Sequence, residues 1–199
     1  MKRKLFKLLW DFLGIPFRLV IFDQNWLSAF GWTTLEEERI NASLPFIYGR
    51  LLDIGAGNNN LVKIYGNGIG VDIFDWGAGS IIVNKTSELP FRNESFDTIT
   101  FLACLNHIPY RQDVLIEATR LLRPGGKVII TMINPILGNF GHFIWWYAED
   151  RKRGGMKDGE VGGMWSSDII ELGNKSNLTL IQHSRFVYGM NNLYVFKAT

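Results

Sequence analysis

The chain has 199 residues, and 47% of them are apolar, which is enough to bury one full core. A chain of this length favours one domain with extensions. The formal net charge of +2 is too small to indicate nucleic-acid binding. Cys104 is the only cysteine, so an internal disulfide is excluded, and a reducing, cytoplasmic location is the default.

Residues 1–22 have the pattern of an amphipathic helix with a basic start. The polar stripe of this helix holds Lys4, Lys7, Asp11 and Gly14. The opposite face holds Leu5, Leu8, Leu9, Phe12 and Leu13. Charged residues interrupt the apolar run too often for a transmembrane span, and Asp11 also argues against a signal peptide. Two interpretations stay open: the helix lies in the interface of an anionic membrane, or it packs on the rest of the protein or on a second subunit.

The next predicted element is a helix that begins at a capping box. Thr34 and Glu37 have the spacing of this motif. The pattern extends the helix to about Ala42, and Pro45 ends it before the first strand.

A loop with two glycines follows the first predicted strand. The strand Leu51–Ile54 contains Asp53, and Gly55 and Gly57 come directly after it. Glycines can take positive φ, and without a Cβ they let the backbone touch a ligand, so the stretch predicts a binding loop. A dinucleotide fingerprint needs a third glycine where Asn60 stands, which disfavours an NAD-dependent oxidoreductase.

Strands and helices alternate through the rest of the chain. Further strands are predicted at Ile69–Ile73, Phe96–Phe101, Lys127–Met132, Leu178–His183 and Leu193–Phe196. Helices are predicted over Tyr110–Leu122 and from the N-capping residues Ser166–Asp168 to about Leu172. This alternation indicates a parallel sheet with helices on both faces, and such sheets bind ligands at the carboxyl ends of their strands. Asp53, Asp72 and Leu102 all lie at such ends.

Five motifs occur in order at ordinary spacing. They are Leu51–Leu61, Ile69–Ile73, Glu88–Phe91, Ser95–Phe101 and Leu121–Ile130. As a set they resemble the class I S-adenosylmethionine (SAM)-dependent methyltransferases, in particular the type 11 small-molecule branch. The resemblance implies an α/β, Rossmann-like fold, with a mostly parallel seven-stranded sheet, helices on both faces and a C-terminal antiparallel hairpin. It also implies a methyltransferase with SAM as its cofactor.

The resemblance further implies a division of the chain into two parts. Residues 45–199 form the methyltransferase domain, with residues 133–165 as an insertion on the acceptor side. Residues 1–44 form the amphipathic helix and a segment that in this family commonly folds over the cofactor. Within that segment Trp26, Phe30 and Trp32 belong either to the lid or to the core. In the insertion, the aromatic run 140–147 is expected to line an acceptor pocket, and the charged run 149–160 to form a mobile loop.

The resemblance assigns the cofactor-binding residues motif by motif. They are Asp53, Gly55, Gly57, Asp72, Ile73, Thr86, Ser87 and Leu102. Two positions depart from the family pattern. Asn59 stands where a third glycine is usual, and asparagine can also adopt the left-handed conformation. Lys85 stands where an acid commonly accepts from the adenine amino group, so the adenine contact is assigned to the backbone around Thr86 and Ser87.

Catalysis by this family needs orientation more than a dedicated base, because the reactive methyl belongs to the cofactor. For a hydroxyl acceptor the candidate base is His107, just after the fourth strand, with His142 as its competitor and His183 expected to be structural. No spacing indicates a metal site. We therefore predict O-methylation of a small or lipid-linked acceptor, such as a saccharide or isoprenoid-like compound, by a cytoplasmic protein on the inner face of the membrane. The alternative is a catalytically inactive, membrane-associated SAM-binding protein.

Overall fold

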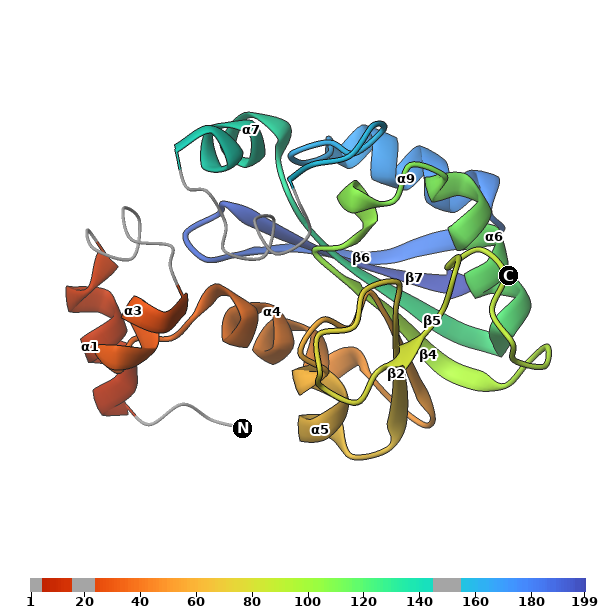
Figure 1. Cartoon of the computed structure of the whole chain (residues 1–199), viewed down its shortest axis with the longest axis horizontal. Helices are drawn as coiled ribbons and strands as arrows, with labels where there is room; N and C mark the ends of the chain where they lie inside the picture. The colour runs from red at the N-terminus through yellow and green to blue at the C-terminus, as the bar shows by residue number, and fades with distance from the viewer. Residues whose placement is uncertain (1–4, 16–23, 145–154) are drawn as a thin grey trace.

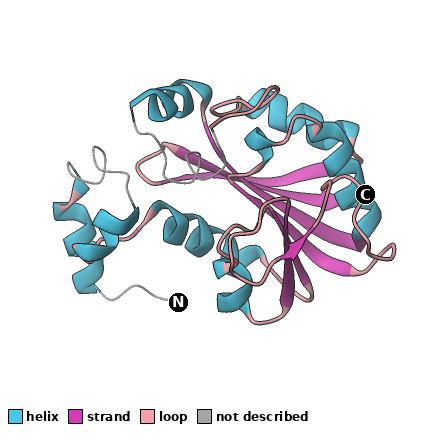
Figure 2. Cartoon of the chain, viewed as in Figure 1, coloured by secondary structure: helices cyan, strands magenta, loops and turns pink. Residues whose placement is uncertain are grey.

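The computed structural model describes residues 5–15, 24–144 and 155–199. The expectations that concern residues 1–4, 16–22 and 145–154 therefore lie outside the described residues. Figure 2 shows the arrangement of the described part, in which a single twisted sheet carries helices on both of its faces.

The centre of the fold is a seven-stranded sheet with the order β3-β2-β1-β4-β5-β7-β6. The strands are β1 (Leu51–Ile54), β2 (Gly68–Asp72), β3 (Ile81–Ile82), β4 (Phe96–Leu102), β5 (Leu122–Ile133), β6 (Leu178–Phe186) and β7 (Asn191–Ala198). Neighbours from β3 to β5 pair in parallel, and β7 pairs antiparallel with both β5 and β6. This topology confirms the predicted fold class, including the C-terminal antiparallel hairpin (Figure 1).

The strand order reverses at β1, which lies between β2 and β4. Asp53 of β1 is in register with Gly70 on one side and Thr100 on the other. In open α/β sheets the ligand crevice forms outside the carboxyl ends of the strands at such a switch point. The topology therefore places a crevice where the glycine loop leaves β1.

Helices close both faces of the sheet (Figure 1). They are α4 (Leu35–Ser43), α5 (Asn60–Tyr65), α6 (Arg111–Leu121), α7 (Pro135–Ile144) and α9 (Ser166–Lys175), with short 3₁₀ turns η1 (Leu44–Phe46) and η2 (Leu105–His107). Successive strand residues point to opposite faces. Val128 and Ile130 of β5 thus join the larger apolar cluster under α6 and α9, while Ile129 joins the smaller cluster under α4 and α5.

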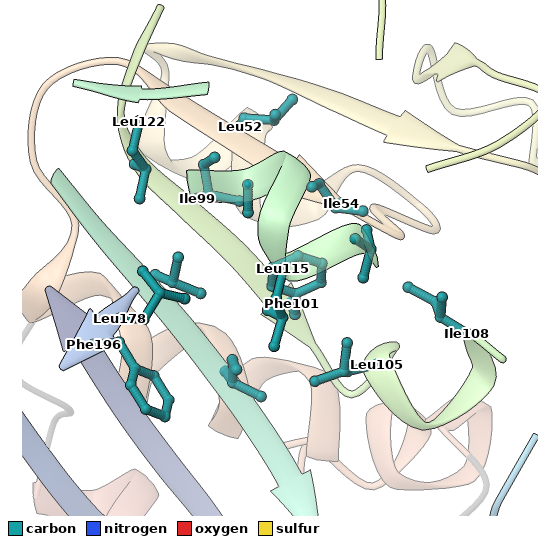
Figure 3. Packing of buried hydrophobic residues seen from close by; sticks show 14 of the residues in the cluster. Leu52, Ile54, Ile99, Phe101, Leu105, Ile108, Leu115, Leu122, Leu178 and Phe196 are labelled. Carbon is teal, nitrogen blue, oxygen red and sulfur yellow. The ribbon is translucent and has the colours of Figure 1, made fainter. Parts of the chain in front are cut away.

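The larger cluster is the main core of the protein. Figure 3 shows how side chains from the strands, from α6 and from η2 meet in it. Phe101, Leu115 and Phe196 are completely buried there. Truncation of such a phenylalanine to alanine typically costs about 3–5 kcal/mol, so this layer fixes the sheet that positions the crevice.

Several predicted boundaries differ from the observed ones, and the differences in β5 and α9 have a clear physical reason. β5 begins at Leu122 rather than Lys127, because the pairing with β4 shifts register between Phe96 and Thr98 and accommodates the Pro-Gly-Gly stretch. The N-cap of α9 is Trp165, without a side-chain capping bond, so the predicted capping by Ser166–Asp168 is wrong. α9 also continues past Leu172 to Lys175. The capping box of Thr34 and Glu37 is confirmed at the start of α4.

The N-terminal helices α1 (Leu5–Leu13) and α3 (Gln24–Ala29) lie at one end of the molecule, away from the sheet (Figure 1). Asp11 is only 3% exposed, and Thr33 donates to its carboxylate from the backbone nitrogen (2.8 Å) and from Oγ1 (2.6 Å). Trp10 Nε1 donates to the carbonyl of Phe30. The predicted polar stripe of α1 therefore faces the protein.

The apolar face of α1 points outward. Its large exposed side chains are Leu5, Phe6, Leu8, Leu9, Trp10, Phe12 and Leu13. Phe6 is the most exposed of them, at 77%. A helix on a globular protein ordinarily buries its apolar stripe, so α1 has the opposite orientation. No helix in the described part of the chain has the length and hydropathy that a membrane span requires.

Candidate active site

The loop after β1 has the backbone that a ligand cradle requires. Gly55 has φ +73° and Gly57 has φ +50°, and both are conformations that L side chains rarely adopt. The nitrogen of Gly55 donates to the carbonyl of Val71 at 2.9 Å, which ties the loop to β2. Asn59 takes the left-handed conformation with φ 58°, so it fulfils the backbone role of the glycine that is usual there.

Gly70 is a residue of the site that the sequence reasoning missed. A Cβ at this position would collide with the side chains of Ala56 and Asn59. The absence of a side chain at position 70 therefore lets the loop approach β2. Two glycines in the stretch Gly68–Gly70 were read as part of a turn and a strand, and only the tertiary packing reveals their purpose.

Asp72 joins the end of β2 to the loop. Its Oδ2 accepts from the nitrogen of Gly57 at 2.9 Å, and its Oδ1 accepts from the nitrogen of Phe74 at 3.0 Å. A carboxylate has about four acceptor sites, so these two bonds leave capacity for a ligand. Asp72 is thus oriented by the backbone at the mouth of the crevice.

Asp53 is the most deeply buried acid of the site. Thr100 Oγ1 donates to its Oδ1 at 2.6 Å. Burial raises the pKa of Asp53 from its ordinary value of 3.8 to about 7; the charges of Asp72 and Glu36 act in the same direction, and the bond from Thr100 opposes the rise. This carboxyl can therefore hold a proton near neutral pH, and it would release that proton to solvent when a cationic ligand group binds beside it.

Cys104 packs beside Asp53. Its Sγ donates to the carbonyl of Ile54 at 2.9 Å. Burial raises the pKa of the Cys104 thiol well above its ordinary value, and the charges of Asp53 and Asp72 contribute to the rise. The thiolate is the nucleophilic form, so this cysteine is unsuited to nucleophilic catalysis.

One cavity collects most of the predicted site residues. Those that line it are Asp53, Gly55, Gly57, Asp72, Ile73, Thr86, Leu102 and His107. Ser87 is adjacent in the chain but does not line the cavity. The hydroxyls of Thr86 and Ser87 are both buried without a hydrogen-bond partner. Such orphaned polar atoms are rare in folded proteins, and the polar edge of an adenine would satisfy the one at Thr86, so the residues present fit the cofactor.

α4 supplies a wall of the cavity that was not predicted. Glu36, Arg39 and Ile40 line it, and Glu36 Oε1 accepts from Asn60 Nδ2 at 2.9 Å. The spacing of these three residues places them on one helix face. Because the capping box fixes where α4 begins, this spacing is the signal by which they could have been found. Trp76 and Tyr110 also line the cavity.

Phe30 and Trp32, which the sequence assigns either to a lid or to the core, pack beside α1. The Trp32 ring stacks on Trp10 with centroids 6.3 Å apart, and Phe30 lies 5.3 Å from Trp32. Neither Phe30 nor Trp32 lines the cavity. The side chain of Trp26 lies outside the described residues. In the described structure α4, rather than this aromatic cluster, covers the crevice.

Lys85 does not bring a charge into the cavity. Its Nζ lies 2.7 Å from Glu88 Oε1, at an exposed position, and 5.6 Å from the ring centroid of Tyr110. It is not among the residues that line the cavity. The departure from the family pattern at position 85 therefore removes an acid without adding a cation to the site.

His107 lies in η2, and its Nδ1 is 3.0 Å from Glu160 Oε2. The side chain of Glu160 is 3% exposed. Glu160 ends the run that was expected to form a mobile loop, and in the structure the residues from Gly159 onward bond to η2 and to Arg111. A carboxylate that fixes the ring of a histidine in a cavity is an arrangement suited to proton transfer.

Of the two other histidines, the structure describes the side chain of His183 but not that of His142. His183 Nε2 lies 3.0 Å from Asn192 Oδ1, and its ring stacks on Tyr194 with centroids 4.6 Å apart, which is a packing role. His142 belongs to α7, and its side chain lies outside the described residues. Among the described residues, no cluster of three or more His, Cys, Asp or Glu side chains is arranged to hold a metal ion.

A sheet of this order with a glycine loop at its switch point defines the class I methyltransferase fold. Comparison with known proteins agrees: residues 52–130 match the family model described as a methyltransferase domain. The 27-O-demethylrifamycin SV methyltransferase of Amycolatopsis mediterranei is 34% identical over 123 residues, which are 49% of this chain and 44% of the relative. The demethylmenaquinone methyltransferase of Renibacterium salmoninarum is 29% identical over 105 residues, or 46% and 44% of the two chains.

A solved structure supports the fold independently. A SAM-dependent methyltransferase of Thermotoga maritima superposes with a TM-score of 0.63 at 17% identity, over 81% of this chain and 88% of that chain. Residues 52–130 thus match a methyltransferase domain, and the comparisons confirm the predicted resemblance to the class I SAM-dependent methyltransferases, with SAM as the cofactor of that family. The chain spans about half or less of the length of the curated relatives it matches first.

Proposed function

We propose that this protein transfers the methyl group of SAM to an oxygen atom of a small or lipid-linked acceptor. The observation that carries the proposal is the cavity at the carboxyl ends of β1, β2 and β4. It combines the glycine loop and Asp72 with His107 as a histidine placed for proton transfer. Because the chain covers only part of its curated relatives, the activity itself belongs to this proposal.

The cavity residues suit different parts of SAM. Asp72, oriented by the nitrogens of Gly57 and Phe74, suits the ribose hydroxyls. Thr86 suits a polar edge of adenine, and Ile73 and Leu102 offer apolar contact to its faces. Asp53 suits the amino group of the methionine part, because a cation would offset the cost of ionising this buried carboxyl.

SAM supplies a methyl group on a positively charged sulfur, so the protein has to orient the acceptor and remove a proton. The acceptor oxygen would form the new bond to the methyl carbon, the electron pair of the broken carbon–sulfur bond would stay with sulfur, and the hydroxyl proton would pass to His107. Alignment of the reacting groups can lower a barrier by up to about 7–11 kcal/mol. A base adds about 100- to 10,000-fold in rate.

An oxygen acceptor is also favoured by the names of the relatives. One is a 27-O-demethylrifamycin SV methyltransferase, and another is a ubiquinone biosynthesis O-methyltransferase. The demethylmenaquinone methyltransferase acts, by its name, on a quinone. The two O-methylation names support a hydroxyl acceptor, and the quinone names support an isoprenoid-like one.

The outward apolar face of α1 supports a location at the membrane surface, on the cytoplasmic side. Several large apolar side chains are exposed on one helix of nine residues, while its acid is buried against Thr33. In the sequence, Lys2, Arg3 and Lys4 precede this face, and each would add roughly 1 kcal/mol on an anionic surface. A helix with this arrangement suits insertion into the headgroup region.

Liposome sedimentation tests the membrane location. Phe6→Asn together with Phe12→Asn should abolish binding to vesicles that contain anionic lipid, and the binding of the unmodified protein should fall as salt is raised. The matched control is Ile64→Asn with Ile136→Asn, which changes two exposed apolar residues on α5 and α7. Equal sedimentation of both variants would refute the membrane location. A dimer in light scattering that only the α1 variant loses would assign the face to a second copy.

The inactive alternative receives less support from the site. It was motivated by Asn59 and Lys85, but Asn59 adopts the left-handed conformation and Lys85 lies outside the cavity lining. Calorimetry with SAM, S-adenosylhomocysteine and NAD tests the cofactor, and only the first two should bind. Labelled SAM should then transfer its methyl group to a component of a membrane-lipid or saccharide extract. Binding without any transfer would favour the inactive alternative.

A further inference from the structure

The segment that follows the undescribed residues of the insertion is fixed onto η2. Val161 and Asn106 exchange two hydrogen bonds: the Val161 nitrogen donates to the Asn106 carbonyl at 2.9 Å, and Asn106 Nδ2 donates to the Val161 carbonyl at 3.0 Å. A little further along, the nitrogen of Met164 donates to the carbonyl of Ile133 at 3.1 Å. These bonds connect residues that are far apart in the chain, so the position of residues 159–164 is set by tertiary structure.

Arg111, at the start of α6, ties the same two segments together. Its Nε donates to the carbonyl of Leu105 at 3.1 Å, and its Nη2 donates to the carbonyls of Asn106 (2.9 Å) and Gly159 (2.8 Å). Gly159 has φ +83°, and a side chain there would meet Pro109. The guanidinium therefore holds the residue before Glu160 beside the residues before His107.

This construction buries the carboxylate of Glu160 against His107. The Glu160 side chain is 3% exposed, and its Oε2 is 3.0 Å from Nδ1 of the ring. Burial of a carboxylate is costly unless a cation or a hydrogen-bond donor faces it. The charge of Arg111 and the Nδ1–H of the imidazole provide both. Burial lowers the pKa of Arg111, and the charge of Glu160 opposes this fall.

We propose that Glu160 is the positioning residue for His107 in methyl transfer. Its carboxylate accepts a hydrogen bond from Nδ1–H, holds the ring against the cavity wall and leaves the proton-accepting role to Nε2. When Nε2 takes the proton of the acceptor hydroxyl, the carboxylate stabilises the resulting imidazolium. The inference rests on the proposed function for its chemistry, but the orientation of the ring can be tested without an acceptor.

A structural role alone would make a different prediction. If the pair only locked residues 159–164 onto η2, loss of Glu160 would change stability without changing which ring nitrogen is protonated. The tautomer of a histidine is set by the hydrogen bond that one of its nitrogens makes. The ring tautomer is therefore a measurement that separates positioning from locking.

Nitrogen NMR of histidine-labelled protein provides this measurement. The chain has three histidines, and His107→Gln identifies the signal of position 107. In the unmodified protein, neutral His107 should carry its proton on Nδ1. In Glu160→Ala the Nε2–H form should become the major one, while Glu160→Gln, which keeps an acceptor oxygen, should retain Nδ1–H. Glu171→Ala, at an exposed ion pair on α9, is the matched control and should leave the signal unchanged.

The rate of methyl transfer provides a second test, measured with labelled SAM and a panel of phenols and alcohols as acceptors. Glu160→Ala should lower kcat roughly 10- to 100-fold while SAM affinity in calorimetry stays within twofold, and Glu171→Ala should match the unmodified protein. An unchanged tautomer in folded Glu160→Ala overturns the inference, and so does unchanged kcat. If the tautomer changes as expected but the unmodified protein methylates neither these acceptors nor a component of the lipid and saccharide extracts, the orientation of the ring by Glu160 stands and the proposed oxygen acceptor is contradicted.

Discussion

α1 and α4 are both nine-residue helices, yet they turn opposite kinds of face toward the protein. α4 buries Leu35 and Ile40 and adds Glu36 and Arg39 to the cavity wall. α1 buries Asp11 and presents its apolar side chains to the outside. The difference shows that a helical pattern separates two faces but does not say which of them is covered.

Substitutions in the crevice and substitutions in α1 should therefore affect different properties of the protein. SAM binding in the crevice depends on backbone shape and buried charge. Membrane binding by the outer face of α1 depends on its apolar area and on the hydrogen bonds that hold the helix on the protein. Substitutions in one region should leave the assay of the other unchanged, and the four experiments below test this separation from the largest expected effect to the smallest.

The contribution of Asp53 to the free energy of unfolding should depend clearly on pH. Its pKa is raised from 3.8 to about 7, so folding binds its proton more tightly, and the stability this contributes is fully present below pH 3.8 and lost as pH rises through about 7. A displacement of this size corresponds to roughly 4 kcal/mol at most. The unfolding free energy of the unmodified protein, relative to Asp53→Asn, should fall between pH 4 and pH 7.5 in urea titrations. A difference that stays flat over this range would show that Asp53 is ionised throughout.

Gly55→Val should cost at least about 3 kcal/mol of SAM affinity, or roughly 100-fold, because it combines backbone strain with a collision. φ is +73° there, and a Cβ would lie 2.6 Å from Cβ of Cys104. Calorimetry measures the loss, and liposome binding through α1 should persist. Gly57→Ala is the control, since nothing lies within 4 Å of a Cβ at that position and only strain remains. Normal SAM binding by folded Gly55→Val would place the ligand elsewhere.

Asp72→Ala should weaken SAM binding by about 1–3 kcal/mol, because the ribose hydroxyls would lose a charged acceptor. The matched control is Asp75→Ala. Asp75 is an exposed acid three residues further on, whose Oδ1 accepts from the nitrogen of Gly77. The two affinities are compared by calorimetry with SAM, and equal values would remove Asp72 from the cofactor site.

Thr33→Val should have the smallest effect of the four substitutions, and this effect should be confined to α1. It removes the bond from Thr33 Oγ1 to the buried carboxylate of Asp11 and keeps the bond from the backbone nitrogen. The expected cost is about 1–2 kcal/mol in the stability of α1 against the protein, read as faster hydrogen exchange in α1. SAM affinity should not change. A drop in SAM affinity equal to that of Asp72→Ala would show that the two regions are coupled.

Much of the crevice could be predicted because its parts are local in sequence. The glycines that leave β1, the acid that ends β2 and the capping box of α4 each depend on a few neighbouring residues. Seven of the eight predicted cofactor-binding residues line one cavity, and Ser87 is the exception. The early start of β5 could not be predicted, because it depends on the shifted pairing of Phe96 with Leu122.

By itself, the sequence determined the class of fold and the location of the ligand loop, because periodicity and turn chemistry act over short distances. Only the tertiary structure decided that α4 walls the cavity, that α1 turns its apolar face outward and that Glu160 meets His107. The last two depend on Asp11 reaching Thr33 across 22 residues and on His107 reaching Glu160 across 53. A buried charge is stabilised by donors that tertiary folding brings close to it, and no local sequence pattern indicates which distant residue will supply them.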